Sequence, residues 1–113
     1  MKKLILALFC SAVSFSALAG GNIDNGKALA DKYSCAACHG KDFNSPIDPS
    51  YPKLAGQHQD YLQHALTAYK RGDGANGRSN AIMTGQVKPL TNQDIKDIAA
   101  YLHSLPGSLV NHR

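Results

Sequence analysis

The stretch Cys35-Ala36-Ala37-Cys38-His39 is the most informative part of this chain. Its two cysteines lie three positions apart, and a histidine directly follows the second cysteine. Two thiols at this spacing can add to the two vinyl groups of a haem, and the adjacent imidazole can then ligate the iron. The motif therefore predicts one covalently attached haem c, bound through Cys35 and Cys38, with His39 as an axial ligand of the iron.

Two other uses of a C-x-x-C pair remain open. Cys35 and Cys38, followed by His58 and His64, superficially resemble a zinc finger of two cysteines and two histidines. However, histidines six positions apart on a helix point to different sides, and His39 would have no role in a zinc site. A thioredoxin-like redox disulfide needs a strand before the helix, and no strand pattern precedes this motif. Haem is therefore favoured over zinc or a disulfide.

The N-terminus has the pattern of a secretory signal peptide. Met1-Lys2-Lys3 precedes an apolar run from Leu4 to Ala19, which closes on the small-x-small site Ala17-Leu18-Ala19. The run has sixteen residues, fewer than the roughly 20 that are needed to cross a bilayer. We expect residues 1–19 to be a cleaved signal peptide and residues 20–113 to be a single periplasmic domain that does not span the membrane.

The composition fits a small domain whose core is completed by a cofactor. The expected mature chain keeps 94 of the 113 residues and contains no Trp and a single Phe, Phe43. Because a chain of this size buries a limited core, a large flat apolar group would extend that core. Loss of Lys2 and Lys3 leaves ten Lys and Arg against eight Asp. This small excess of positive charge gives no indication of nucleic-acid binding.

Hydrophobic periodicity predicts helices. The first is expected over about 24–39 and should end at Gly40, a residue type that commonly follows a helix C-terminus. Apolar residues at i, i+3, i+4 and i+7 predict a second helix over about 58–70. Thr91-Asn92-Gln93-Asp94 resembles a capping box and begins a third helix, whose apolar stripe runs to Leu105.

The segments between these helices are expected to be long loops. Residues 41–56 contain three prolines and no alternation of apolar and polar side chains, and residues 78–90 also lack a clear period. No strand is predicted. Because long loops are unusual in a compact domain unless they serve a function, they fit a chain that wraps a prosthetic group. The expected fold class is all-α.

A covalent haem usually has a second axial ligand opposite His39. Met83 is one candidate, and a thioether there would raise the reduction potential relative to a second imidazole. A lone methionine is often a core filler, but the expected loop position of Met83 argues against that role. We predict Met83 as the sixth ligand, with His58 as the alternative because it shares the apolar face of the second helix. The remaining histidines, interpreted as surface groups, are His64, His103 and His112.

The chain resembles the small class I cytochromes c of bacterial periplasms over essentially its whole mature length. The matching segments are Gly26-Lys27, the C-x-x-C-H-G run to Gly40, Tyr51-Pro52-Lys53-Leu54-Ala55-Gly56-Gln57, Tyr61-Leu62, Met83, and Leu90 through Ala99-Ala100-Tyr101-Leu102. This resemblance implies the class I cytochrome c fold, in which three to five helices and long loops wrap one covalent haem.

The resemblance also implies roles for single residues. Pro52 would accept a hydrogen bond from the His39 ring through its backbone carbonyl and so fix the ring orientation. The first and last helices would cross near Gly26, with Tyr101 or Leu102 packed close by. The candidates for contacts to the haem propionates are Arg78, Tyr61, Arg71 and Gln57.

The leading interpretation is a soluble periplasmic monohaem cytochrome that carries single electrons between respiratory redox partner proteins and is not an enzyme. The alternative is a haem enzyme or sensor with a labile sixth ligand, which binds small molecules or reduces peroxide and would use a distal histidine such as His58. A third interpretation makes the chain a fixed subunit of a respiratory complex. The sequence does not specify the electron donor or acceptor.

Overall fold

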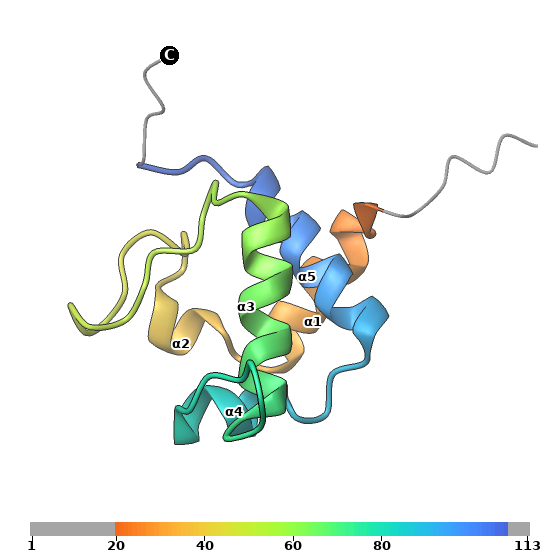
Figure 1. Cartoon of the computed structure of the whole chain (residues 1–113). Helices are drawn as coiled ribbons and strands as arrows, with labels where there is room; N and C mark the ends of the chain where they lie inside the picture. The colour runs from red at the N-terminus through yellow and green to blue at the C-terminus, as the bar shows by residue number, and fades with distance from the viewer. Residues whose placement is uncertain (1–19, 109–113) are drawn as a thin grey trace, which may run out of the picture.

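The computed structural model describes residues 20–108, which form five helices and no strand (Figure 1). The helices are α1 (Ile23–Lys32), α2 (Ala36–His39), α3 (Gln59–Arg71), α4 (Ala81–Val87) and α5 (Asn92–Ser104). The predicted all-α class is confirmed. No helix in this part of the chain is long and apolar enough to cross a membrane. The expected signal peptide (residues 1–19) and His112 lie outside the described residues.

The packing of α1 across α5 depends on Gly26. A Cβ atom built at Gly26 would lie 2.0 Å from the carbonyl oxygen of Asp97 and 2.8 Å from the Cβ atom of Tyr101. Any side chain at this position would therefore push the two helices apart. The crossing near Gly26, with Tyr101 close by, is the arrangement that the family resemblance implies.

A buried carboxylate ties the start of α1 to α5. Asp97 is only 3% exposed, and its oxygens accept hydrogen bonds from the backbone nitrogen of Asn22 at 2.8 Å, Asn25 Nδ2 at 2.6 Å and Gln93 Nε2 at 2.8 Å. Burial by itself would raise the pKa of Asp97. The three hydrogen bonds favour the charged form and outweigh burial, so that the pKa lies below its ordinary value.

The C-terminal helix α5 supplies much of the hydrophobic core. Its predicted apolar stripe is buried at Ile95, Ile98, Ala99 and Leu102. The predicted capping box is confirmed, since the Thr91 hydroxyl accepts from the backbone nitrogen of Asp94 at 3.0 Å and the Asp94 carboxylate accepts from that of Thr91 at 3.0 Å. α5 packs against both α1 and α3, and α3 packs against α4. α5 is therefore the central helix, with α1 and α3 packed against it.

The prediction of one continuous helix over 24–39 is wrong. α1 ends at Lys32, and Ser34 adopts a φ of 54° before α2 begins. A left-handed residue interrupts an α-helix because its backbone no longer follows the right-handed path. The predicted stop at Gly40 is confirmed, with a φ of 90°. After the break, α2 lies apart from α1, on the other side of the ribbon of α3 in the view of Figure 1.

The prediction of a loop over 78–90 is also wrong, because this segment contains α4. The Asn80 side chain caps the helix, and its Oδ1 accepts from the backbone nitrogens of Ile82 and Met83, each at 3.1 Å. α4 has only seven residues and contains Gly85, so its sequence is too short to show a clear helical period. The predicted loop over 41–56 holds no helix or strand, and α3 confirms the predicted second helix.

The Gly26 crossing leads to a matched pair of variants. Gly26→Ala should lower the free energy of unfolding by about 2–4 kcal/mol, because the added methyl group meets the α5 backbone. Gly85→Ala should raise it by about 0.5–1 kcal/mol, since Gly85 lies within α4 with nothing within 4 Å of its built Cβ atom. Denaturant unfolding of the haem-loaded proteins measures both. Equal effects of the two variants would show that the crossing tolerates a side chain.

The Asp97 network predicts a pH-dependent contribution to stability. Because the pKa of Asp97 is lowered in the folded state, its contribution is present above the unfolded pKa of about 3.9 and is lost as the pH falls through the folded pKa. Asp97→Asn should therefore cost about 1–3 kcal/mol at pH 7 and progressively less below pH about 4. Asp73→Asn, in an exposed loop, serves as the control. A pH-independent loss in the Asp97 variant would contradict this explanation.

Candidate functional site

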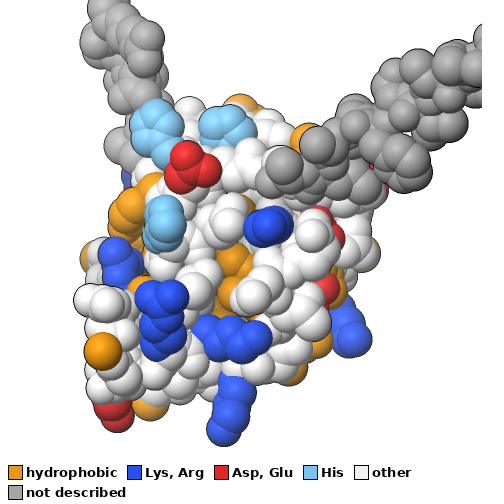
Figure 2. Space-filling model, turned by 45° about the vertical axis from the view of Figure 1, so that its right-hand side comes forward, with side chains coloured by type: hydrophobic (Ala, Val, Ile, Leu, Met, Phe, Trp, Pro, Cys, Tyr) orange, Lys and Arg blue, Asp and Glu red, His pale blue; other side chains and the backbone are white. Residues whose placement is uncertain are grey.

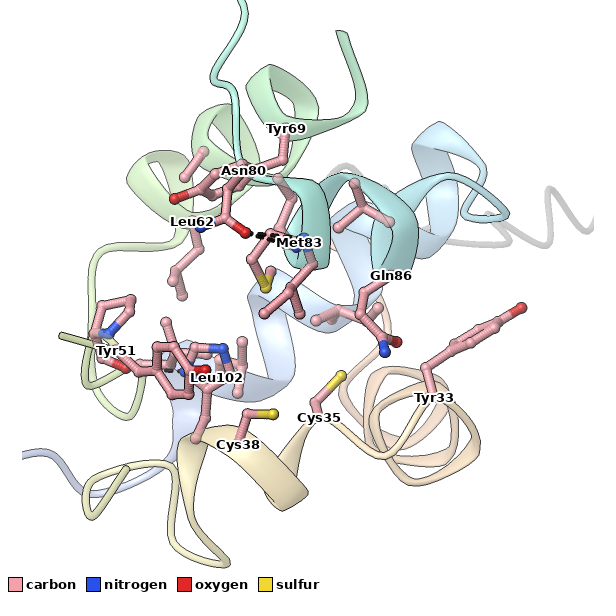
Figure 3. A pocket seen from close by; sticks show the side chains of 18 of the residues that line it. Tyr33, Cys35, Cys38, Tyr51, Leu62, Tyr69, Asn80, Met83, Gln86 and Leu102 are labelled. Carbon is pink, nitrogen blue, oxygen red and sulfur yellow. Dashed lines mark hydrogen bonds between the residues drawn. The ribbon is translucent and has the colours of Figure 1, made fainter. Parts of the chain in front are cut away.

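A largely apolar cavity opens between α2, α3, α4 and the loop before α3 (Figure 3). Its floor and walls include side chains from every helix of the described chain. The apolar lining residues are Ala30, Leu54, Leu62, Ala65, Leu66, Ile82, Val87, Leu90, Ile98 and Leu102. Among the residues that the structure describes, no Asp or Glu lines the cavity, and Arg78 is the only Lys or Arg that does. The lining thus suits a large apolar group that carries a small amount of negative charge.

The predicted attachment residues face this cavity from one turn of helix. Cys35 directly precedes α2, and Cys38 and His39 follow it at i+3 and i+4, so the three side chains share one side of the turn. Both sulfurs point into the cavity in Figure 3, and the two cysteines are not joined in a disulfide. Burial raises the pKa of the Cys35 thiol. The pair is therefore placed to form two thioether bonds with one group in the cavity.

His39 lines the cavity with its ring held in one orientation. The side chain is buried, and Nδ1 lies 3.0 Å from the carbonyl oxygen of Pro52. Because a carbonyl can only accept, Nδ1 carries the proton, and the lone pair of Nε2 is free to bind a metal. The ring of Tyr51 lies 6.3 Å from that of His39, centre to centre. The loop over 50–54 thus sets both the tautomer and the position of the imidazole.

Met83 approaches the cavity from the side opposite the two cysteines. Its side chain is half-buried, and in Figure 3 its sulfur points inward from α4 while Cys35 and Cys38 face it from α2. The cap provided by Asn80 fixes the backbone at Met83. A neutral thioether is a soft ligand that is suited to ferrous iron.

The three other histidines within residues 20–108 lie away from the cavity. His58, His64 and His103 are all exposed, and none of them lines it; histidine side chains are visible at the surface in Figure 2. The expected inward position of His58 is wrong, because this residue precedes α3 rather than lying on its apolar face. His64 lines a shallow polar groove between α3 and α5. Within residues 20–108, no three His, Cys, Asp or Glu side chains form a metal-binding group.

Arg78 and Tyr61 line the cavity, whereas Arg71 and Gln57 do not. The guanidinium carbon of Arg78 lies 5.8 Å from the ring centre of Tyr61 and 5.7 Å from that of Tyr69. Hydrogen bonding to Tyr61, and then to Tyr69, raises the pKa of Arg78. The sequence gives no separate signal for Tyr69, because its spacing on α3 matches that of a core residue.

The family profile described as cytochrome c matches residues 23–106. The chain belongs to the cytochrome c family. It is 42% identical over 113 residues to cytochrome c4 of Stutzerimonas stutzeri, an alignment that covers 96% of this chain and 52% of the relative. It is also 42% identical over 71 residues to cytochrome c-554(548) of Halomonas halodenitrificans, which covers 63% of this chain and 83% of the relative. These relatives are electron-transfer proteins rather than enzymes.

The fold is similar to that in the crystal structure of reduced recombinant cytochrome c4 from Pseudomonas stutzeri. The TM-score is 0.70 at 41% identity, over 79% of this chain and 48% of that chain. The chain therefore spans about half the length of the cytochrome c4 relatives it matches. It is a class I cytochrome c domain with the C-x-x-C pair, Cys35 and Cys38, that attaches haem c, and its sequence contains one such motif.

Haem attachment is tested by removing the thiols singly and together. Cys35→Ala and Cys38→Ala should each leave one thioether bond, and the double variant should leave none, because each thiol consumes one vinyl group. The absorption of the alkaline pyridine complex reports the number of unreacted vinyl groups, and haem staining after denaturing electrophoresis reports covalent retention. Haem that stays covalently bound in the double variant would contradict attachment through these cysteines.

Proposed function

We propose that the chain, after removal of residues 1–19, is a periplasmic electron carrier that passes single electrons between respiratory redox partner proteins. The observation that carries this proposal is the placement of three kinds of group around one apolar cavity. These groups are the Cys35 and Cys38 thiols, the free Nε2 of His39 and the sulfur of Met83. The resemblance of the first nineteen residues to a signal peptide supports the periplasmic location.

In this proposal His39 and Met83 would hold the haem iron, one from α2 and the other from α4. Haem, when bound, supplies an iron that alternates between the ferric and ferrous states. The hydrogen bond to Pro52 keeps Nδ1 of His39 protonated and directs Nε2 into the cavity. Asn80 holds the backbone of Met83 at the start of α4. Ligands held in this way stay in place in both oxidation states, so that little of the chain reorganises when an electron is transferred.

The apolar lining favours the reduced state. Leu62, Leu102 and Ile98 are each 3% exposed and line the cavity. Side chains of this kind exclude water, and a low-polarity environment disfavours the more highly charged ferric iron. The thioether of Met83 acts in the same direction. Together they give a reduction potential above that of a site with two imidazole ligands.

A haem enzyme or sensor would need an open sixth position and a distal acid or base. The sequence offers His58 for that base, but His58 is exposed at the start of α3 and does not line the cavity. Met83 instead lines the cavity, where it offers a thioether sulfur in place of an open position. The geometry thus supports a carrier better than an enzyme. A free carrier and a fixed subunit of a respiratory complex would share this site, and co-purification with a membrane complex distinguishes them.

Replacement of Met83 tests the proposal. Met83→Ala should lower the reduction potential, remove the weak long-wavelength absorption band of the ferric protein and let the ferrous protein bind carbon monoxide, because the sixth position becomes open. Absorption spectroscopy with a redox titration measures all three. Gly85→Ala, on the same helix but with nothing within 4 Å of its built Cβ atom, should leave each property unchanged.

His58→Ala completes the comparison. This variant should behave as the unmodified protein in all three measurements, since His58 lies outside the cavity. If Met83→Ala kept its potential and excluded carbon monoxide while His58→Ala did not, the sixth ligand would be His58 and the assignment of Met83 would be wrong.

A further inference from the structure

The turn formed by residues 54–57 is attached to the end of α5 by two neighbouring hydrogen bonds (Figure 1). The backbone nitrogen of Gly56 donates to the carbonyl oxygen of Leu102 at 2.9 Å, and Nδ1 of His103 lies 2.7 Å from the carbonyl oxygen of Gln57. Because a carbonyl can only accept, the ring of His103 is the donor in the second bond. Among the described residues, no other hydrogen bond joins residues 54–57 to a helix.

This turn leads back to Pro52, the residue whose carbonyl oxygen accepts from the ring of His39. The turn is closed by a hydrogen bond from the backbone nitrogen of Gln57 to the carbonyl oxygen of Leu54 at 3.3 Å. The backbone nitrogen of Leu54 in turn donates to the carbonyl oxygen of Phe43 at 2.8 Å. One residue separates Leu54 from Pro52, and the ring of a proline fixes its own φ angle. The position of the turn therefore determines where the Pro52 carbonyl lies.

The end of α5 is a firm base for this turn. Leu102 is 3% exposed and belongs to the hydrophobic core. Gly56 has a φ of 71°, and a Cβ atom built there would lie 2.9 Å from the backbone nitrogen of Gly107, so that the turn is pressed against the chain that follows α5. His103 adds a second point of attachment beside Leu102. Two points of attachment fix the direction of the turn, whereas a single hydrogen bond lets it pivot.

We propose that His103 is a positioning residue for the iron ligand His39 and acts through residues 54–57 and the carbonyl of Pro52. The inference rests on the proposed function, since it takes His39 as a ligand of the iron. Without the ring of His103, the turn pivots about its bond to Leu102, and the Pro52 carbonyl leaves Nδ1 of His39 more often. A weaker hydrogen bond makes the imidazole a less basic ligand, which disfavours the ferric state.

The chain offers matched variants for the test. His103→Ala removes the donor to the turn, whereas His103→Asn keeps a short side chain whose N–H group can donate to the same carbonyl. His64→Ala is the control, because His64 is also an exposed histidine on a helix but lines the shallow groove between α3 and α5. His103→Ala and His64→Ala thus remove the same ring from the surface and gain the same helix propensity.

The measurement is hydrogen exchange of the reduced, haem-loaded proteins, followed by NMR. The reporters are the Nδ1–H group of His39 and the backbone N–H group of Gly56, and the N–H group of Ala30, buried in α1, reports global unfolding. His103→Ala should speed exchange at both reporters about twofold to tenfold, as expected for the loss of one hydrogen bond from a locally opening turn. Exchange at Ala30 should stay unchanged. His103→Asn should restore most of the protection, and His64→Ala should change neither reporter.

A redox titration of the same proteins gives a second readout. The ratio of reduced to oxidised protein at a fixed ambient potential should rise in His103→Ala and return toward its original value in His103→Asn. Equal changes in His103→Ala and His64→Ala would overturn the inference. Unchanged exchange at His39 and Gly56 in His103→Ala would also overturn it, as would an equal acceleration at Ala30, which would show a general loss of stability.

The absorption spectrum separates this inference from the proposed function. Axial-ligand bands that are the same in every variant, together with faster exchange in His103→Ala alone, support the positioning role. Absence of those bands in the unmodified protein would instead contradict ligation by His39 and Met83, whatever the exchange rates of the His103 variants.

Discussion

The hydrogen bond between His39 and the carbonyl oxygen of Pro52 is the contact on which the site depends. It joins the turn that carries the two cysteines to the loop before α3, two segments that share no regular secondary structure. A carbonyl acceptor permits one tautomer only, so this single contact determines both the direction of the ring and the nitrogen that is free for iron. Without it, the imidazole could rotate and neither the tautomer nor the direction of Nε2 would be fixed.

The packing of the other helices connects this contact to α4, the helix that carries Met83. The close approach at Gly26 and the Asp97 network lock α1 to α5, and α1 leads through the left-handed Ser34 to the cysteine turn. On the other side, α3 packs against both α5 and α4, and Asn80 anchors the start of α4. The packed helices α1, α5 and α3 thus support both α2, which carries His39, and α4, which carries Met83.

The sequence predicts those features that depend on neighbours in the chain. The C-x-x-C-H turn, the capping box at Thr91 and the helix α3 all follow from local spacing. α4 escapes prediction because a helix of seven residues shows too little periodicity, and its stability comes from the Asn80 cap and from packing. The hydrogen bonds of Asp97 join α5 to Asn22 and Asn25, which are more than seventy residues away in the chain. Arg78 lies beyond the end of α3, the helix that carries its neighbour Tyr69. Only the three-dimensional arrangement brings such groups together.

The most direct measurement of ligation by His39 and Met83 is the proton NMR spectrum of the reduced, haem-loaded protein. A methyl group bound to the iron through sulfur lies over the porphyrin, whose ring current moves its signal far upfield. Met83 is the only methionine after Met1, so that a single shifted methyl resonance would assign the ligand, and we predict that resonance. A reduced protein with covalent haem and no upfield methionine methyl would contradict the proposed iron site.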